Sequence, residues 1–228
     1  MTNKSDLNNL TKSEEDYLKA LFQLLVEMRI PKVGNNLLAS YLEVSPASAN
    51  NMIKKLKQKR FVDSEKYSKL ILTESGKSYA LHLIRKHRLW ETFLHQYLNF
   101  SWEEVHEVAE QLEHIKSIKL VNELDRFMKY PTKDPHGESI PDAKGVYHSQ
   151  KKISLSSLTS GDCCRLIAVN DDSVDFLQYL NEIKLSLTDH ITVIQRREFD
   201  GSMKIQFREV EETISQKIAD YLFVSVVS

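Results

Sequence analysis

Apolar residues recur every three or four positions over most of the first 130 residues, a spacing typical of helices that bury one face. Thr11 and Glu14 form a capping box ahead of the first such stretch, and Pro31 ends it. Residues 36–42 predict a second, short helix. The chain is therefore expected to begin with two consecutive helices.

A third helix and a hairpin are predicted next. Ser45 followed by Pro46 is typical of an N-cap and a first helical residue. Strands are predicted to begin at Phe61 and to return at residues 70–72. Two short helices with a tight turn, followed by a two-stranded hairpin, indicate a winged helix-turn-helix.

Long helices follow the hairpin. One is predicted to lead through residues 85–98, and a capping box of Ser101 and Glu104 predicts another over residues 102–128. The segment 131–145 contains three prolines and two glycines and cannot continue a helix. The main domain boundary is expected there.

Beyond this boundary the pattern changes to short apolar runs. Such runs are typical of strands and bound one helix-like segment, residues 174–183. A small β-barrel or sheet fits a module of about 70 residues. The predicted strands are residues 163–170, 190–199, 203–210 and 221–227.

Charge and cysteine usage restrict the class of protein. The formal net charge is −1, yet residues 50–77 contain eight lysine or arginine residues and three acidic ones, a local net charge of +5. The two cysteines, Cys163 and Cys164, are adjacent, which disfavours a relaxed disulfide and fits a reducing cytoplasm. No run of eighteen apolar residues is present, so no association with a membrane is expected.

The third helix and the hairpin carry the predicted contacts to double-stranded DNA. Small residues and asparagines at the start of the helix would meet base edges, and lysines and arginine would neutralise phosphates. A solvent-exposed helical module without DNA contacts is the simpler alternative, but it does not explain a hairpin directly after a basic helix. The predicted DNA-binding residues are Ser45, Ala47, Ser48, Asn50, Asn51, Lys54, Lys55, Arg60, Lys66 and Lys69.

Metal-ligand residue types recur one helical turn apart on the two long helices. Carboxylates and imidazoles without a thiolate suit manganese or iron better than structural zinc. A charged helix surface is the alternative explanation of this pattern, and Asp16 would equally suit the first turn of its helix. The candidate ligands are Asp16, His87, Glu91, His106, Glu110, Glu113 and His114.

Several motifs carry a family resemblance. SEEDYLKALFQLL, LTESGK, RKHRLWETFL, VHEVAEQLEHI and DPHGESIP occur in this order, and the chain resembles the diphtheria toxin repressor family of metal-dependent transcriptional repressors. The resemblance implies a mainly α chain with a small β module. Its three domains would be a winged helix-turn-helix (1–75), a helical metal-binding and dimerisation domain (76–145) and an SH3-like C-terminal barrel (146–228).

The same resemblance implies two metal sites. A primary site would fall on Asp16, Glu110, Glu113 and His114. An ancillary site would fall on His87, Glu91 and His106, completed by Asp172 and Asp175 from the C-terminal module.

Differences in residue type between branches of the family indicate which metal the chain would bind. Asp16 and Glu110 stand where iron-type members carry methionine and cysteine, which resembles the manganese-responsive branch. Lys19 stands where shorter manganese members carry a glutamate. We therefore expect a cytoplasmic homodimer that binds a palindromic operator and represses metal-uptake genes with Mn²⁺ as corepressor, with Fe²⁺ as the alternative metal and one or two ions per subunit.

Two other classes are weighed against this expectation. Two ions held by histidines and carboxylates could activate water in a metalloenzyme, but the sequence offers neither a separate general base nor a phosphate loop, so no enzyme is predicted. A helix-turn-helix regulator that answers to an organic ligand in the C-terminal module is the third class. Operator binding independent of metal would favour it.

Overall fold

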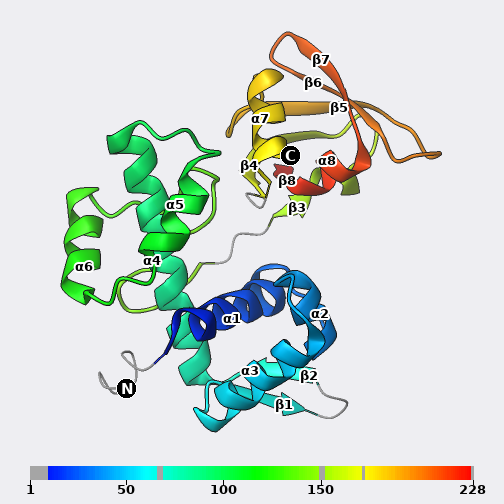
Figure 1. Cartoon of the computed structure of the whole chain (residues 1–228). Helices are drawn as coiled ribbons and strands as arrows, with labels where there is room; N and C mark the ends of the chain where they lie inside the picture. The colour runs from blue at the N-terminus through cyan, green and yellow to red at the C-terminus, as the bar shows by residue number, and fades with distance from the viewer. Residues whose placement is uncertain (1–9, 66–68, 149–151, 171–172, 227–228) are drawn as a thin grey trace. The chain divides into compact units, whose positions relative to one another are not determined.

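The computed structural model describes residues 10–65, 69–148, 152–170 and 173–226 (Figure 1). Its helices are α1 (Lys12–Phe22), α2 (Asn35–Tyr41), α3 (Pro46–Gln58), α4 (Glu74–Leu98), α5 (Val105–Leu112), α6 (Ile118–Phe127), α7 (Val174–Glu182) and α8 (Gln216–Tyr221). Its strands are β1 (Val62–Glu65), β2 (Lys69–Leu72), β3 (Ile153–Ser154), β4 (Cys163–Val169), β5 (His190–Arg196), β6 (Met203–Phe207), β7 (Val210–Ile214) and β8 (Leu222–Val226).

The predicted capping signals are confirmed at the first and third helices. The Thr11 hydroxyl accepts from the Glu14 backbone N–H, and the Glu14 carboxylate accepts from the Thr11 backbone N–H, which completes the capping box. The Ser45 hydroxyl likewise accepts from the Ser48 backbone N–H at the start of α3. The chain after α1 forms a π-helical turn, Gln23–Glu27, instead of continuing as α-helix to Pro31.

The helix-turn-helix and its hairpin share one apolar core. Strands β1 and β2 pair antiparallel, with Val62 opposite Leu72. Phe22, Leu38 and Leu56 from the first three helices are fully buried in a cluster that also includes Leu70 of β2. Burial of this cluster is the main stabilising contribution available to so small a module, and it fixes the orientation of α1 relative to α3.

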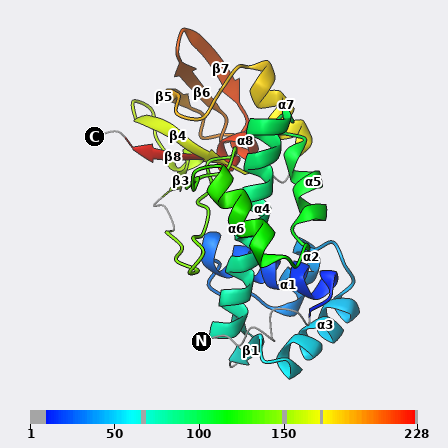
Figure 2. The same cartoon turned by 90° about the vertical axis from the view of Figure 1, so that its left-hand side faces the viewer.

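The single helix predicted over residues 102–128 is wrong: the structure divides it into α5 and α6. Ser117 caps α6 by accepting from the Leu120 backbone N–H, and Glu113 and His114 lie in the turn between the two helices. Arg85 of α4 donates to Asp125 of α6 over 2.7 Å, so α6 lies against the first half of α4 (Figure 2). The break therefore comes from capping and long-range contacts, not from proline or glycine.

The C-terminal strands form a six-stranded antiparallel sheet with the order β3-β8-β4-β5-β6-β7. The run predicted as one strand over residues 203–210 turns at Arg208, whose φ of 51° lies in the left-handed region, and so continues into β7. The sequence pattern missed α8, although Ser215 caps it. Together with α7, these strands make the β-rich domain that the sequence predicts.

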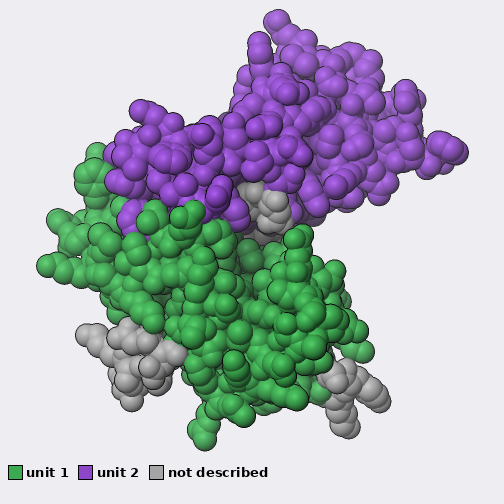
Figure 3. Space-filling model, viewed as in Figure 1, with its two compact units in different colours: residues 1–89, 110–129, 140–148 green, residues 90–109, 130–139, 149–228 purple. Residues whose placement is uncertain are grey.

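The chain divides into two compact units (Figure 3). Unit 1 comprises residues 1–89, 110–129 and 140–148, and unit 2 comprises residues 90–109, 130–139 and 149–228. The division falls inside α4 and inside α5, so the predicted boundaries after residues 75 and 145 stay a prediction. Within the described ranges, the chain forms no helix that is both long and apolar enough to cross a membrane.

Candidate metal centre

Three groups of histidine and carboxylate side chains bring ligand atoms within 4.8 Å of one another in the described part of the chain. Imidazole nitrogen and carboxylate oxygen are both ligands of divalent first-row metals, so each group is a candidate for metal binding. The groups are Asp16 with Glu113 and His114; His87 with His106 and Glu110; and Glu91 with Asp134 and His136.

The first group joins α1 to the turn after α5. Asp16 lies on α1, and His114 Nε2 lies 3.2 Å from Asp16 Oδ1 and 3.9 Å from Glu113 Oε1. These three atoms are buried, and none has a hydrogen-bond partner among the described residues. Buried polar atoms are nearly always satisfied in folded proteins. A bound cation would satisfy all three atoms at once, so the residues present fit a metal ion.

Electrostatics supports the same interpretation. Burial raises the pKa of the Asp16 carboxyl to about 6; His114 opposes this shift, and the nearby Glu110 and Glu113 add to it. Despite His114, burial and the two neighbouring carboxylates thus leave ionised Asp16 short of compensating positive charge. A divalent cation would supply that charge and stabilise the ionised form.

Glu15 orients His114 within this group. Its Oε2 lies 2.5 Å from His114 Nδ1, and its Oε1 accepts a hydrogen bond of 2.6 Å from the Tyr79 hydroxyl. An ionised carboxylate only accepts hydrogen bonds, so Nδ1 of His114 carries the proton and Nε2 is left to bind metal. Helical spacing assigns no role to Glu15, although its place beside Asp16 in the sequence is a signal for one.

Lys19 lies at the other side of Glu113. Its Nζ is 2.6 Å from Glu110 Oε1, 2.7 Å from Glu113 Oε2 and 3.2 Å from His87 Nδ1. Burial alone would raise the pKa of the Glu113 carboxyl, but the charge of Lys19 and the hydrogen bond from His87 outweigh burial and lower it to about 2. Glu113 is therefore an anion in the folded protein.

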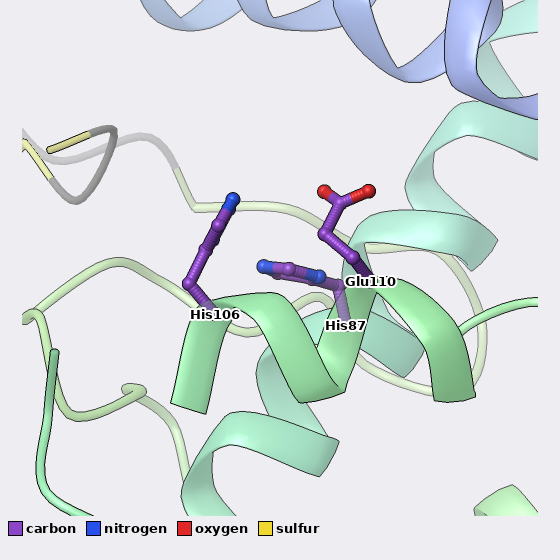
Figure 4. Close-up of side chains that lie close together, drawn as sticks. All are labelled: His87, His106 and Glu110. Atoms are coloured by element: carbon purple, nitrogen blue, oxygen red, sulfur yellow. The ribbon is translucent and has the colours of Figure 1, made fainter. Parts of the chain in front are cut away.

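The second group contains two of the predicted ancillary ligands, His87 from α4 and His106 from α5 (Figure 4). Their side chains converge with that of Glu110, which was predicted in the primary site. The third predicted ancillary ligand, Glu91, contacts His106, with 3.4 Å between His106 Nδ1 and Glu91 Oε1. The structure thus brings the predicted ligands together but divides them differently between groups.

The third group was missed by the sequence analysis. Glu91 and His136 are fully buried and Asp134 is nearly so. His136 Nε2 donates to the Trp102 carbonyl oxygen over 2.8 Å, so His136 Nδ1 is left facing Glu91 Oε1 at 3.9 Å. Asp134 also shapes its own loop, because its Oδ1 accepts from the backbone N–H of His136.

Two further ancillary ligands were predicted from the C-terminal module. Asp175 is exposed in the first turn of α7 and belongs to none of the three groups. Asp172 lies outside the described residues.

The predicted DNA-binding residues on α3 form an exposed face. Ala47, Asn51 and Lys55 are exposed on α3 on the side opposite the buried Ala49 and Ile53. Lys66 of the hairpin lies outside the described residues. The other predicted contacts, Ser45, Ser48, Asn50, Lys54 and Arg60, are also exposed, and Lys69 is half-buried.

Several of these polar side chains have partners within the protein. The Ser45 hydroxyl caps α3, and Asn50 Oδ1 accepts a hydrogen bond from Asn35 Nδ2. Asn51 is exposed at the same helical surface. It is therefore the stronger candidate of the two asparagines for a base contact.

Three family models match consecutive parts of the chain. The N-terminal DNA binding domain of iron dependent repressors matches residues 9–70, and their metal binding and dimerisation domain matches residues 73–142. The FeoA domain matches residues 153–226. Together these matches span almost all of the described residues.

Individual relatives agree with the family models. The iron-dependent repressor IdeR of Mycobacterium leprae is 27% identical over 202 residues, which cover 82% of this chain and 86% of the relative. The regulator MntR of Bacillus subtilis is 30% identical over 124 residues, covering 54% of this chain and 85% of the relative.

Solved structures extend the likeness to the whole fold. A manganese-dependent transcriptional repressor in complex with manganese is 32% identical with a TM-score of 0.88, and the match covers 94% of this chain and all of that chain. The manganese regulator SloR is 31% identical with a TM-score of 0.80, with 96% and 100% covered. The chain belongs to the diphtheria toxin repressor family of metal-dependent transcriptional repressors.

Proposed function

We propose that this family member is a cytoplasmic, homodimeric repressor that binds a palindromic operator of metal-uptake genes when Mn²⁺ occupies the Asp16–Glu113–His114 group. Fe²⁺ is the alternative metal. The observation that carries the proposal is the convergence of three buried ligand atoms without hydrogen-bond partners on α1 and on the turn after α5.

The position of Asp16 explains how metal and DNA binding can be linked. Asp16 lies on α1, which shares its core with α3, the predicted reading helix. A bound divalent ion would add positive charge beside Asp16 and beside the Glu113 oxygen that Lys19 does not contact. Conformations that hold α1 against the turn at residues 113–114 present a complete ligand set, so they bind metal more tightly than others do. If DNA favours the same conformations, each ligand strengthens the binding of the other.

The donor set favours Mn²⁺. The first group offers two carboxylates and one imidazole and contains no cysteine. Hard oxygen donors suit manganese, whereas thiolates suit zinc and copper(I). Intrinsic affinity rises from Mn²⁺ to the later metals in nearly any site, so selectivity would come from donor hardness and geometry.

A second ion is proposed at the buried third group. Glu91, predicted as an ancillary ligand, lies there with Asp134 and His136. His136 is held by its bond to the Trp102 carbonyl group, as expected for a ligand fixed by its second ring nitrogen. None of these three residues belongs to the helix-turn-helix, so we assign this ion to stability and not to gating.

The dimer is proposed to form through α6 and its neighbours. Ile118, Leu120 and Phe127 are large apolar residues on α6 that are between 41% and 59% exposed. Exposed apolar patches of this kind commonly mark protein interfaces. The family model that covers this segment is described as a dimerisation domain.

Metal-gated binding is tested by selecting a duplex from a random pool with Mn²⁺ present and measuring its affinity by fluorescence anisotropy. With chelator the affinity should fall to the roughly 10⁻⁴ to 10⁻⁶ M typical of non-specific contacts, and Mn²⁺ should restore specific binding. Equal affinity in both conditions would contradict the proposal and favour a regulator that answers to an organic ligand. Turnover of generic esters in Mn²⁺ would favour an enzyme instead.

The selected duplex also separates base contacts from phosphate contacts. Asn51→Ala should cost roughly 1 to 3 kcal/mol and relax the preference at one base position. Lys55→Ala should weaken binding to all sequences alike and lower the salt slope by about one. Uniform loss in both variants would show that α3 does not read the bases.

A further inference from the structure

Lys19 is a buried lysine whose surroundings are those of a metal ion. Its Nζ contacts two carboxylate oxygens, Glu110 Oε1 at 2.6 Å and Glu113 Oε2 at 2.7 Å, and lies 3.2 Å from His87 Nδ1. Only 6% of the residue is exposed. A buried ammonium is costly unless anions compensate it, and here the two carboxylates compensate it, beside a histidine of the type that also binds metals.

Glu113 divides its two oxygens between Lys19 and the first group. Its Oε2 is shared by Lys19 Nζ and His87 Nδ1, at 2.7 Å and 2.6 Å. Its Oε1 faces His114 and has no hydrogen-bond partner among the described residues. A carboxylate with one oxygen on each of two cation positions resembles the bridging ligand of a two-metal site.

Asp16 and Lys19 are three residues apart on α1 and therefore share a face of that helix. One helix thus presents an anion to the first cation position and a permanent cation to the second.

We propose that Lys19 is a specificity-determining residue whose ammonium group fills the second cation position, so that Glu113 can bridge Lys19 to one divalent ion but not two ions to each other. This inference rests on the proposed metal site at Asp16. Lys19 contributes one positive charge without a metal and links α1 to Glu110 and Glu113 in the apoprotein. The ion count at this centre is thereby fixed by the chain itself.

The test counts the ions bound by the whole 228-residue chain. Mn²⁺ per chain is measured by equilibrium dialysis and mass spectrometry for the parent and for Lys19→Glu, with Lys77→Glu as a control that makes the same charge change at an exposed position of α4. Lys19→Glu should bind one more ion per chain than the parent, and Lys77→Glu the same number. Because ions in two-metal sites lie roughly 3.5 to 4 Å apart, Lys19→Glu should also show an exchange-coupled Mn²⁺ signal in electron paramagnetic resonance.

The inference would be overturned if Lys19→Glu bound only as many ions as the parent and Lys77→Glu and showed no coupled signal. Asp16→Asn separates this failure from failure of the proposed function. Loss of one ion in Asp16→Asn together with no gain in Lys19→Glu would refute only the role of Lys19. No loss in Asp16→Asn would refute the metal site itself.

A neutral variant decides the question if Lys19→Glu does not fold. Lys19→Gln removes the charge but keeps most of the length of the side chain and a hydrogen-bond donor. The chelated variant should unfold at a lower temperature than the chelated parent, because Glu110 and Glu113 lose their cation. Mn²⁺ should then raise its unfolding temperature by more than it raises that of the parent, since a second ion can enter. An equal rise in both proteins would mean that Lys19 is only a structural ion pair.

Discussion

The Asp16 group and the Glu91 group use the same donors, two carboxylates and one histidine, yet they join different parts of the molecule. Asp16 lies on a helix of the DNA-binding core, and its partners Glu113 and His114 lie almost a hundred residues away along the chain. Asp134 and His136 belong to the proline-rich loop and meet Glu91 of α4 inside unit 2. Similar chemistry is thus placed where it can move a helix in one case and hold a loop in the other.

The two groups also differ in how deeply their side chains are buried. The Asp16 side chain is 31% exposed, whereas Glu91 and His136 are fully buried. A partly open ligand allows an ion to enter and leave as its concentration changes. A closed set of ligands suits an ion that is retained. Residue type alone thus suggests a metal site in both places, and the elements that each group connects decide what an ion there could do.

The largest expected effect comes from Asp16→Asn. The amide removes the anionic ligand on α1, so Mn²⁺ should no longer tighten operator binding, a loss on the order of 10³-fold in affinity. Anisotropy titrations with and without Mn²⁺ measure it. Glu107→Gln, an exposed acid on α5, is the matched control and should behave as the parent does. A fully active Asp16→Asn would show that gating lies elsewhere.

Asp134→Asn should lower the stability that Mn²⁺ adds and leave metal-gated DNA binding unchanged. An asparagine oxygen can still accept the loop hydrogen bonds, but it is a weaker metal ligand, so metal-linked stability should fall. An ion at about a hundredfold excess over its Kd contributes roughly 2.7 kcal/mol of stability, and the Mn²⁺-induced rise in Tm should shrink accordingly. Scanning calorimetry measures this rise. If Asp134→Asn instead abolishes metal-gated DNA binding, the distinction between the two groups is wrong.

Glu15→Gln should weaken Mn²⁺ binding without removing a ligand. Loss of a carboxylate that orients a metal-binding histidine typically costs 10- to 100-fold in metal affinity. Isothermal titration calorimetry of the parent and the variant gives the difference. Tyr79→Phe removes only the hydrogen bond to Glu15 and should have a smaller effect in the same direction. An unchanged affinity in Glu15→Gln would mean that His114 is held by other contacts.

The smallest effect is expected from Thr11→Ala. Loss of the cap at the start of α1 should cost about 1 kcal/mol of stability, in apoprotein and metal-bound protein alike. Urea unfolding with chelator and with Mn²⁺ measures both values. A loss confined to the metal-bound protein would show that the cap acts through the metal site, and Ser215→Ala at the start of α8 provides a cap control in unit 2.

Much of the fold could be predicted because its boundaries are local. Thr11, Ser45 and Pro46 mark helix starts through side-chain and backbone chemistry that a sequence displays directly. The break between α5 and α6 has only the Ser117 N-cap as a local signal. Its turn residue His114 contacts Glu15 from 99 positions away, and no proline or glycine lies between residues 101 and 130 to announce it.

The residues of the candidate metal site also differ in how far local sequence patterns could identify them. Helical spacing identified Glu113 and His114 as ligand types, the family resemblance added Asp16, and the structure brings the three together. Asp134 and His136 lie in a loop, where no periodicity relates one side chain to another. The contacts of Lys19 with its three partners join residues 68 to 94 positions apart, a separation that no local pattern encodes.

The most direct test of the central claim is thermodynamic linkage between the Asp16 site and DNA. The Mn²⁺ affinity of the parent is measured by isothermal titration calorimetry with and without a saturating amount of the selected duplex. Coupling requires that DNA tighten Mn²⁺ binding by the same factor by which Mn²⁺ tightens DNA binding. We predict equal factors in the parent and no coupling in Asp16→Asn. Mn²⁺ affinity that is independent of DNA in the parent would contradict the account.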